Sequence, residues 1–253
     1  MAKKPKYETD DEVVINLDKI AVPGAILLAG VIIAVAVFVS NRDTEGSVDD
    51  QDTDNIAGEE TETPPETAPD APEFADASTD IGDGPYLGDK ENAKVAVVEF
   101  KEYRCGFCKR HVDETFPSIK ENYIDTGKII YVFREFEMYG DDIANAAKCV
   151  YHLGGTDKYV EFDKNAYNLE DDDAIYSLVN TVGVNESDFE SCYTSKQYKD
   201  ELDADKAAGT AAGVQGTPGF VIGTLDSDGN VDGILVPGAY PYDTFAEKIE
   251  SFL

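Results

Sequence analysis

The chain has 253 residues and carries 52 acidic against 21 basic side chains, a net charge of −31. A strongly negative protein repels phosphate backbones, so nucleic acid is not expected as a partner. The acidic residues are spread along the chain and lysine is sparse, a composition typical of proteins from halophilic microbes, where salt screens the repulsion between carboxylates. The length exceeds that of one small domain, and the composition changes along the chain.

Residues 20–39 form an apolar stretch without a charged side chain. A helix of this length, rising about 1.5 Å per residue, spans about 30 Å, the thickness of the hydrocarbon core of a bilayer. We therefore expect an uncleaved transmembrane anchor. The alternative is a cleaved signal peptide, whose apolar region is usually shorter, about 7–15 residues. Because four lysines lie in residues 1–19 and only Arg42 follows closely, the positive-inside rule predicts a cytoplasmic N-terminal segment and an extracytoplasmic remainder.

Residues 40–83 are rich in Asp, Glu, Thr and Pro and contain few apolar side chains. Such a segment buries too little apolar surface to offset the entropy lost on folding, so we expect it to be disordered. It predicts a flexible acidic tether between the anchor and a folded domain over residues 84–253. Binding of a partner through the acidic stretch is the alternative interpretation.

The folded domain is expected to begin with a strand, a helix and a second strand. Residues 94–100 form a nearly continuous apolar run, typical of a strand buried on both faces. A helix over residues 105–123 ends before Gly127, and residues 128–133 form the second apolar strand. This succession predicts a right-handed crossover and a parallel strand pair, hence an α/β fold.

Residues 141–213 have helical character and are expected to form one inserted helical subdomain. Its helical stretches are expected over residues 144–151, 157–168, 171–181, 187–193 and 196–212. Two short strands, 220–222 and 234–236, then flank Asp228-Gly229, a dipeptide that favours a hairpin turn. A closing helix is expected over residues 242–252.

A pair of cysteines follows the first buried strand, in the sequence Cys105-Gly106-Phe107-Cys108. A helix that begins at Cys105 directs free backbone N–H groups and its positive dipole end at that sulfur, which favours the thiolate. The thiolate attacks disulfides, and Cys108 lies one turn further on, where it can resolve a mixed disulfide. All four cysteines lie beyond the expected anchor, in a compartment where disulfides persist.

With these motifs in place, residues from about 91 to 253 resemble the DsbA-like thiol:disulfide oxidoreductases, which have a thioredoxin fold with an inserted helical subdomain. The matching motifs are VEF at 98–100, CGFCKR at 105–110, AAKC at 146–149 and GVQGTP at 213–218. The resemblance implies that Cys105 is the exposed nucleophile and Cys108 the buried resolving thiol. It further implies no cofactor, exported cysteine-containing proteins as substrates, and a membrane redox partner.

The resemblance also assigns the residues that contact substrate. Pro218 matches the family's cis-proline, which faces the cysteine pair, and the backbone of Thr217 would pair with an extended substrate chain. Gly106 and Phe107, between the cysteines, complete the expected substrate-binding surface. An ordinary trans proline in a turn is the alternative for Pro218.

Two further roles follow from the resemblance. Glu99, six residues before Cys105, matches a buried carboxylate that exchanges a proton with Cys108; the alternative is a strand-end glutamate turned to solvent. Cys149 and Cys192 match a structural disulfide found in some relatives, and free core thiols are the alternative.

The chain departs from the strongly oxidising members of the family at the two residues between the cysteines. Gly106 and Phe107 stand where those members carry Pro-His, so an imidazole near the thiolate is missing. Four basic side chains are expected to crowd the site and favour the thiolate: Arg104, Lys109, Arg110 and His111. Whether the protein acts as an oxidase, or as a reductase or isomerase of the same fold, stays open.

A zinc-binding structural module is the alternative from a different functional class. Its ligands would be Cys105, Cys108 and His111 together with Cys149 and His152, but zinc knuckles usually lie in loops, whereas the first pair opens a helix.

Two weaker motifs have simpler explanations. The acidic run from Asp226 to Asp232 hints at calcium, although a solvated hairpin turn fits it better because the glycine is misplaced. Asn185-Glu186-Ser187 is a formal glycosylation sequon that helix capping explains equally well.

Overall fold

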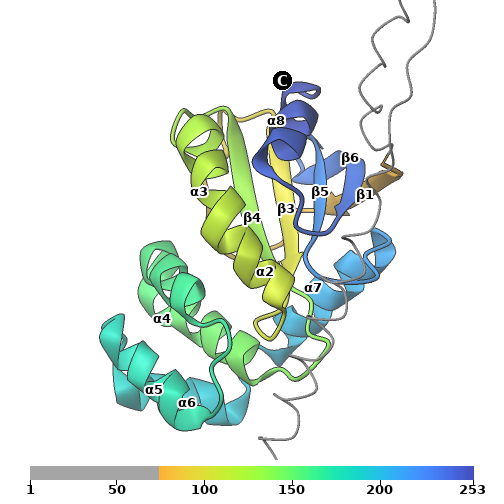
Figure 1. Ribbon diagram of the computed structural model, residues 1–253. Coiled ribbons are helices and arrows are strands. Elements are labelled where there is room, and N and C mark those ends of the chain that lie inside the picture. Colours follow the sequence, from red (N-terminus) through yellow and green to blue (C-terminus); the bar gives the residue numbers. More distant parts are fainter. Residues whose placement is uncertain (1–73) are drawn as a thin grey trace, which may run out of the picture. The chain divides into compact units, whose positions relative to one another are not determined.

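The computed structural model describes residues 74–253, which contain one six-stranded sheet with helices on both faces (Figure 1). The expected cytoplasmic segment, the anchor and most of the linker lie outside the described residues. Within residues 74–253, no helix is both long and apolar enough to cross a bilayer.

The strands lie in the order β1-β6-β5-β3-β4-β2. Their bounds are β1 (Asp76–Asp80), β2 (Tyr86–Leu87), β3 (Val95–Lys101), β4 (Ile129–Glu135), β5 (Gly219–Leu225) and β6 (Asn230–Pro237). Strands β3 and β4 are parallel, as expected for the two apolar runs, and all other neighbours are antiparallel. The hairpin of β5 and β6 is also where the sequence predicts it.

The helical segment after the cysteine pair has the expected extent but not a uniform geometry. It consists of α2 (Gly106–Arg110), α3 (Phe116–Ile119) and two π-helical segments, η2 (His111–Thr115) and η3 (Lys120–Ile124). The expected stretches 144–151 and 157–168 are one helix, α4 (Asp142–Asn165), with a kink at Gly155, where φ is 79°. Glycine adopts this positive φ without the clash of a Cβ atom.

The remaining helices are close to their expected positions. Their bounds are α5 (Asp172–Thr181), α6 (Glu186–Ser195), α7 (Lys199–Ala211) and α8 (Tyr242–Glu250). Helix α6 begins one residue after Asn185, whose side chain accepts a hydrogen bond from the backbone N–H of Asp188. The sequon asparagine is therefore a helix cap in this fold.

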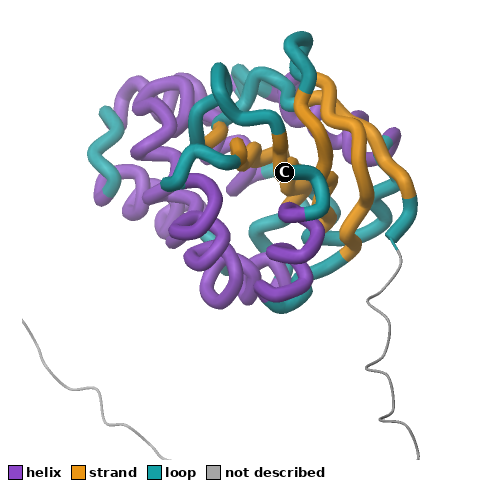
Figure 2. Tube along the Cα trace, turned by 90° about the horizontal axis from the view of Figure 1, so that it is seen from above, coloured by secondary structure: helices purple, strands orange, loops and turns teal. Residues whose placement is uncertain are grey.

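The two faces of the sheet are covered by different helices, and Figure 2 shows the strands side by side as one layer with helices beside it. Val95 and Val97 of β3 belong to the larger core, together with side chains of α3, α4 and α8. Ala96 and Val98 belong to the second core, on the face covered by the end of α7. Since side chains alternate along a strand, Glu99 and Lys101 point to the face of the larger core, which also contains Cys108.

The expected boundary between linker and domain at residue 84 is wrong, because strand β1 lies before it. Residues 76–80, which the sequence analysis assigns to the disordered linker over residues 40–83, form the edge strand paired with β6. Arg134 of β4 fixes its end, since Nη1 binds Asp80 at 2.9 Å and Nε binds Asp205 of α7 at 2.8 Å. The folded domain therefore includes β1, which begins eight residues before residue 84.

A disulfide joins α4 to α6 within the helical insertion. Cys149 and Cys192 are bonded, with their Cα atoms 5.9 Å apart, so the alternative of free core thiols is wrong. This bond also removes Cys149 from the alternative zinc site. Within residues 74–253, no three His, Cys, Asp or Glu side chains are grouped so that they could hold a metal ion.

The acidic run from Asp226 to Asp232 forms the expected hairpin turn. The Asp226 carboxylate accepts hydrogen bonds from the backbone N–H groups of Asp228 and Asn230, both at 2.8 Å. Because these donors and the Asn230 side chain occupy the carboxylate, the residue serves the turn geometry.

Candidate active site

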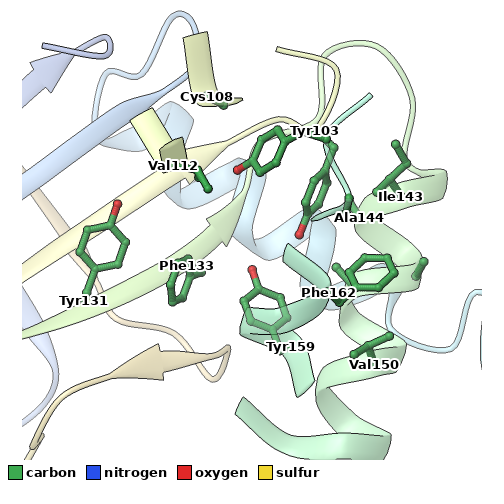
Figure 3. Packing of buried hydrophobic residues seen from close by; sticks show 14 of the residues in the cluster. Tyr103, Cys108, Val112, Tyr131, Phe133, Ile143, Ala144, Val150, Tyr159 and Phe162 are labelled. Carbon is green, nitrogen blue, oxygen red and sulfur yellow. The ribbon is translucent and has the colours of Figure 1, made fainter. Parts of the chain in front are cut away.

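The two cysteines of the motif are free thiols in different surroundings. Cys105 is the N-cap of α2, where its backbone is extended, and its side chain is partly exposed. Cys108 is on the first turn of α2 and is completely buried in the larger core. In Figure 3, Cys108 lies above the tyrosine-rich part of that core, which includes Tyr103 and Tyr159.

Hydrogen bonds at the helix N-terminus stabilise the thiolate of Cys105. The pKa of Cys105 falls to about 5, and the largest cause is a hydrogen bond that the Cys108 thiol donates. Hydrogen bonds with the Thr217 side chain and with the backbone N–H groups of Phe107 and Cys108 lower it further. Partial burial acts in the opposite direction. As a thiol, Cys105 donates to the carbonyl oxygen of Thr217 at 3.1 Å. The Thr217–Pro218 peptide bond in this loop is cis.

The expected contribution of the neighbouring basic residues requires correction. Arg104 makes a two-pronged ion pair with Asp142, with both N–O distances 2.6 Å. Lys109 pairs with Asp113, and Arg110 donates to the Ala239 carbonyl at 2.8 Å and lies over the Phe107 ring. These cations are neutralised or turned to other partners, so the hydrogen bonds described above act on the thiolate most directly.

His111 is also not a charged neighbour of the thiolate. Its side chain is completely buried among Tyr131, Phe220 and Phe245, and burial lowers its pKa to about 3. The ring is therefore neutral. Its Nε2 lies 3.0 Å from the hydroxyl of Tyr131.

Glu99 of β3 points to the face of the sheet that Tyr131 also occupies, and it is 1% exposed. The alternative of a solvent-facing glutamate is therefore wrong. The Tyr131 hydroxyl donates to its Oε2 at 3.0 Å. Because this hydroxyl donates to Glu99, it accepts from Nε2–H of His111, which fixes the imidazole tautomer. Glu99, Tyr131 and His111 thus form a buried chain of three hydrogen-bonding side chains.

Burial raises the pKa values of both Glu99 and Cys108. Burial raises the pKa of Glu99 to about 8, although the charge of Lys101 opposes the rise. Burial, the hydrogen bond to Cys105 and the charge of Glu99 raise the pKa of Cys108 far above that of Cys105. A carboxyl group that titrates near neutral pH can accept or return the proton of a buried thiol.

Glu102, which no motif in the sequence singles out, holds the loop that leads to Cys105 in place. Its buried carboxylate accepts hydrogen bonds from the backbone N–H groups of Arg104 at 2.9 Å, Met138 at 2.7 Å and Tyr139 at 3.2 Å. It therefore ties the loop before Cys105 to the loop after β4. Met138 and Tyr139 are largely exposed there, as is Phe107 beside the nucleophile.

Lys101 was also missed, although the sequence contained a signal for it. It follows Glu99 by two residues in a strand whose seven side chains are all buried, so it lies on the same face. Its ammonium group forms ion pairs with Asp163 of α4 and with Glu135 of β4.

A groove of about 540 Å³ begins at the cis-proline loop. Thr217 and Pro218 form one part of its lining, and Leu235 and Pro237 of β6 form another. Ala75 and Asp76 also line it, so the beginning of β1 borders this groove. The groove adjoins Cys105 through Thr217, whose carbonyl oxygen contacts Sγ, and its lining includes apolar side chains.

Comparison with known proteins places this site in a family. A family model described as "Thioredoxin" matches residues 80–232. A Rickettsia felis protein named as a protein-disulfide oxidoreductase is 28% identical over 213 residues, which cover 79% of this chain and 72% of that protein. A Rickettsia typhi relative of the same name is covered over 55% of its length. A Bacillus cereus protein named as disulfide bond formation protein D is 29% identical over 149 residues, 54% of this chain and 69% of that protein.

Solved structures have the same fold. Wolbachia pipientis alpha-DsbA2, titled a thiol-disulfide exchange protein, is 29% identical with a TM-score of 0.55 over 66% of this chain and 86% of that chain. Oxidised BdbD from Bacillus subtilis has a TM-score of 0.61 at 20% identity, over 71% of this chain and 98% of that chain. These neighbours confirm a thioredoxin-like fold with a helical insertion.

Because hydrogen bonds lower the pKa of Cys105 while burial raises that of Cys108, we expect the two thiols to titrate at widely separated pH values. In the reduced protein, thiolate absorbance near 240 nm should rise with a midpoint near pH 5, and the Cys105→Ser variant should lack this step. Cys108 should stay protonated throughout the neutral range because its pKa is raised. A first midpoint near pH 8.5, the value of an unperturbed thiol, would contradict the assignment.

Proposed function

Because the chain belongs to the thioredoxin family, and within it resembles the DsbA-like proteins, we propose that it introduces disulfides into exported cysteine-containing proteins outside the cytoplasm. Its general activity is thiol:disulfide exchange. The observation that carries the proposal is the contrast between the two thiols. Cys105 is partly exposed and stabilised as a thiolate, whereas Cys108 is buried and its pKa is raised by burial and by the charge of Glu99.

The first step starts from the Cys105–Cys108 disulfide. A substrate thiolate attacks Sγ of Cys105, a bond forms between these sulfurs, and the Cys105–Cys108 bond breaks. The electron pair of the broken bond leaves on Sγ of Cys108. Because Cys108 is buried and its pKa is raised, this thiolate takes a proton from Glu99.

The second step releases the product. A second substrate thiolate attacks the substrate sulfur of the mixed disulfide, and Cys105 leaves as a thiolate. The substrate is oxidised by two electrons and the enzyme is reduced by two. We propose that a membrane redox partner removes these electrons and restores the Cys105–Cys108 disulfide.

The oxidising direction is supported by the stabilised thiolate of Cys105. A low thiol pKa favours the reduced enzyme, and a favoured reduced form makes the disulfide a stronger oxidant. Gly106 and Phe107 supply no imidazole between the cysteines. The hydrogen bonds from Cys108, Thr217 and the helix N-terminus lower the pKa without it.

The surface around Cys105 suits an unfolded polypeptide. The backbone of Thr217 borders the nucleophile, since its carbonyl oxygen is 3.1 Å from Sγ, and Pro218 has no N–H group to obstruct it. Gly106 and Phe107 follow Cys105 in α2, and Phe107 is 60% exposed. The exposed Phe107 ring and the groove lined by Thr217 and Pro218 offer an extended chain apolar surface and backbone groups to pair with.

Trapping of mixed disulfides tests the roles of the two cysteines. The Cys108→Ser variant cannot resolve a mixed disulfide and should accumulate covalent adducts with substrate proteins on non-reducing gels. Cys105→Ser is the matched control and should trap none, because Cys108 is buried. Equal trapping by the two variants would overturn the assignment.

We also propose that residues 20–39 anchor the protein in the membrane, with the domain on the extracytoplasmic side. The uncharged apolar stretch and the lysines before it support this orientation. The acidic residues that follow separate the anchor from the domain.

Protease added to intact cells should therefore cut the acidic segment and release an active domain. The released fragment should contain β1, because residues 76–80 belong to the sheet. A domain that stays protected until the cells are lysed would contradict the orientation. Release without protease would instead indicate a cleaved signal peptide.

We further infer from the net charge of −31 that the protein works in high salt. Salt shortens the Debye length from about 10 Å at 0.1 M to about 3 Å at 1 M, so repulsion between exposed carboxylates weakens. The melting temperature should rise between about 0.1 M and 1 M KCl, a range in which that screening increases. A temperature that stays constant or falls would remove the halophilic interpretation.

A further inference from the structure

Lys101 is a buried cation beneath the cysteine pair. It is the last residue of β3, and its side chain is 0% exposed. Lysine is almost never fully buried unless it is paired. A charge in this position is costly, so its partners and its neighbours need a physical explanation.

Three polar groups from different elements contact the ammonium group. It donates to Asp163 of α4 and to the Tyr103 hydroxyl at 2.7 Å, and it lies 3.3 Å from Glu135 of β4. The Tyr103 hydroxyl is also 2.9 Å from Asp163. We call Lys101, Tyr103, Glu135 and Asp163 the Lys101 cluster.

Aromatic rings enclose the same ammonium group. Its distances to the ring centroids are 3.9 Å for Tyr103, 5.4 Å for Tyr159, 5.9 Å for Tyr167 and 6.0 Å for Phe133. The faces of aromatic rings attract cations, most strongly where water is excluded. The cluster therefore holds the charge in one place.

Glu99 lies two residues before Lys101 on the same face of β3. Its Oε1 is buried and has no hydrogen-bond partner among residues 74–253, whereas Oε2 accepts from Tyr131. The titratable groups that surround it come from every element packed on this face. They are Lys101 of β3, Tyr131 and Glu135 of β4, Cys108 of α2, His111 of η2, Tyr159 and Asp163 of α4, and Tyr167.

Lys101 is the only cation in that set, because His111 is neutral. Its charge is the strongest influence that opposes the burial of Glu99, while the negative charges of Asp163 and Glu135 reinforce the effect of burial. Without Lys101, burial and these two carboxylates would all favour a permanently protonated Glu99.

We propose that Lys101 is a positioning residue whose fixed charge keeps Glu99 able to exchange a proton with Cys108 near neutral pH, and that Asp163 of the helical insertion tunes it. This inference rests on the proposed function, since it concerns the proton of the resolving thiol. It assigns the helical insertion an electrostatic role in the redox reaction.

The step on which Lys101 acts is the reverse of the first step described above, namely the resolution of a mixed disulfide at Cys105 by Cys108. Glu99 takes the proton of the Cys108 thiol, and Sγ of Cys108 attacks Sγ of Cys105. The bond between Cys105 and its partner sulfur breaks, and the electron pair leaves with that sulfur, which takes a proton from water. One disulfide is formed and one is broken, so electrons balance.

The test uses the mixed disulfide between Cys105 and glutathione, whose resolution is followed in a single turnover from pH 5 to 10. In the wild-type protein the rate should rise with a midpoint near 8, the pKa of Glu99. Lys101→Met should move the midpoint up by about one unit and slow the reaction about tenfold at pH 7, because less Glu99 is ionised. Alkylation of reduced Cys105 should keep its wild-type pH profile.

Asp163→Asn is the matched variant, and it should move the midpoint in the opposite direction. It removes a negative charge that disfavours ionised Glu99, so resolution at pH 7 should become faster. A role of the cluster in packing alone would slow or destabilise both variants without shifting either midpoint. Unchanged midpoints in both variants would overturn the proposal.

The remaining outcomes are also decisive. If Lys101→Met fails to fold, the Asp163→Asn midpoint decides alone, and the absence of a downward shift counts against the proposal. Failure of the proposed function would appear separately, as absent trapping of substrate proteins by Cys108→Ser. Glutathione needs no substrate-binding surface, so its reaction tests the Lys101 cluster in either case.

Discussion

The chemistry of this protein depends on holding two thiols, one helical turn apart, in opposite protonation states. The N-terminus of α2 and the Thr217 loop surround Cys105 with hydrogen bonds, so its pKa falls to about 5. Cys108 faces the larger core, where burial raises its pKa. A disulfide between unequal thiols has a preferred site of attack and a preferred leaving group. The direction of exchange follows from this inequality.

The sheet and the helical insertion supply the buried charged groups that act on the two thiols. Strand β3 carries Glu99 and Lys101 on one face, and α4 contributes Asp163 from a segment 62 residues further along the chain. The Cys149–Cys192 bond joins α4 to α6, and Asp163 lies on the same helix beyond the kink at Gly155. The insertion thus does more than cover the site, because one of its carboxylates belongs to the buried charges beneath Cys108.

Local patterns were sufficient to predict most of the fold and the central residues of the site. The apolar run of β3, the cysteine spacing and the Asp228-Gly229 turn are encoded over a few residues, and family resemblance added Pro218 and the Cys149–Cys192 pair. Strand β1 was missed because its sequence DASTD contains no large apolar residue and its order depends on β6 and Arg134. Likewise, the acidic partners that neutralise Arg104 and Lys101 are remote in sequence.

The central claim is that stabilisation of the Cys105 thiolate makes the Cys105–Cys108 disulfide oxidising. The most direct measurement is the equilibrium of this pair with reduced and oxidised glutathione at pH 7, with the Cys149–Cys192 bond intact. We predict a reduction potential nearer to about −120 mV, the value of a strong dithiol oxidant, than to about −270 mV, the value of thioredoxin. A potential close to the thioredoxin value would contradict the account and indicate a reductase.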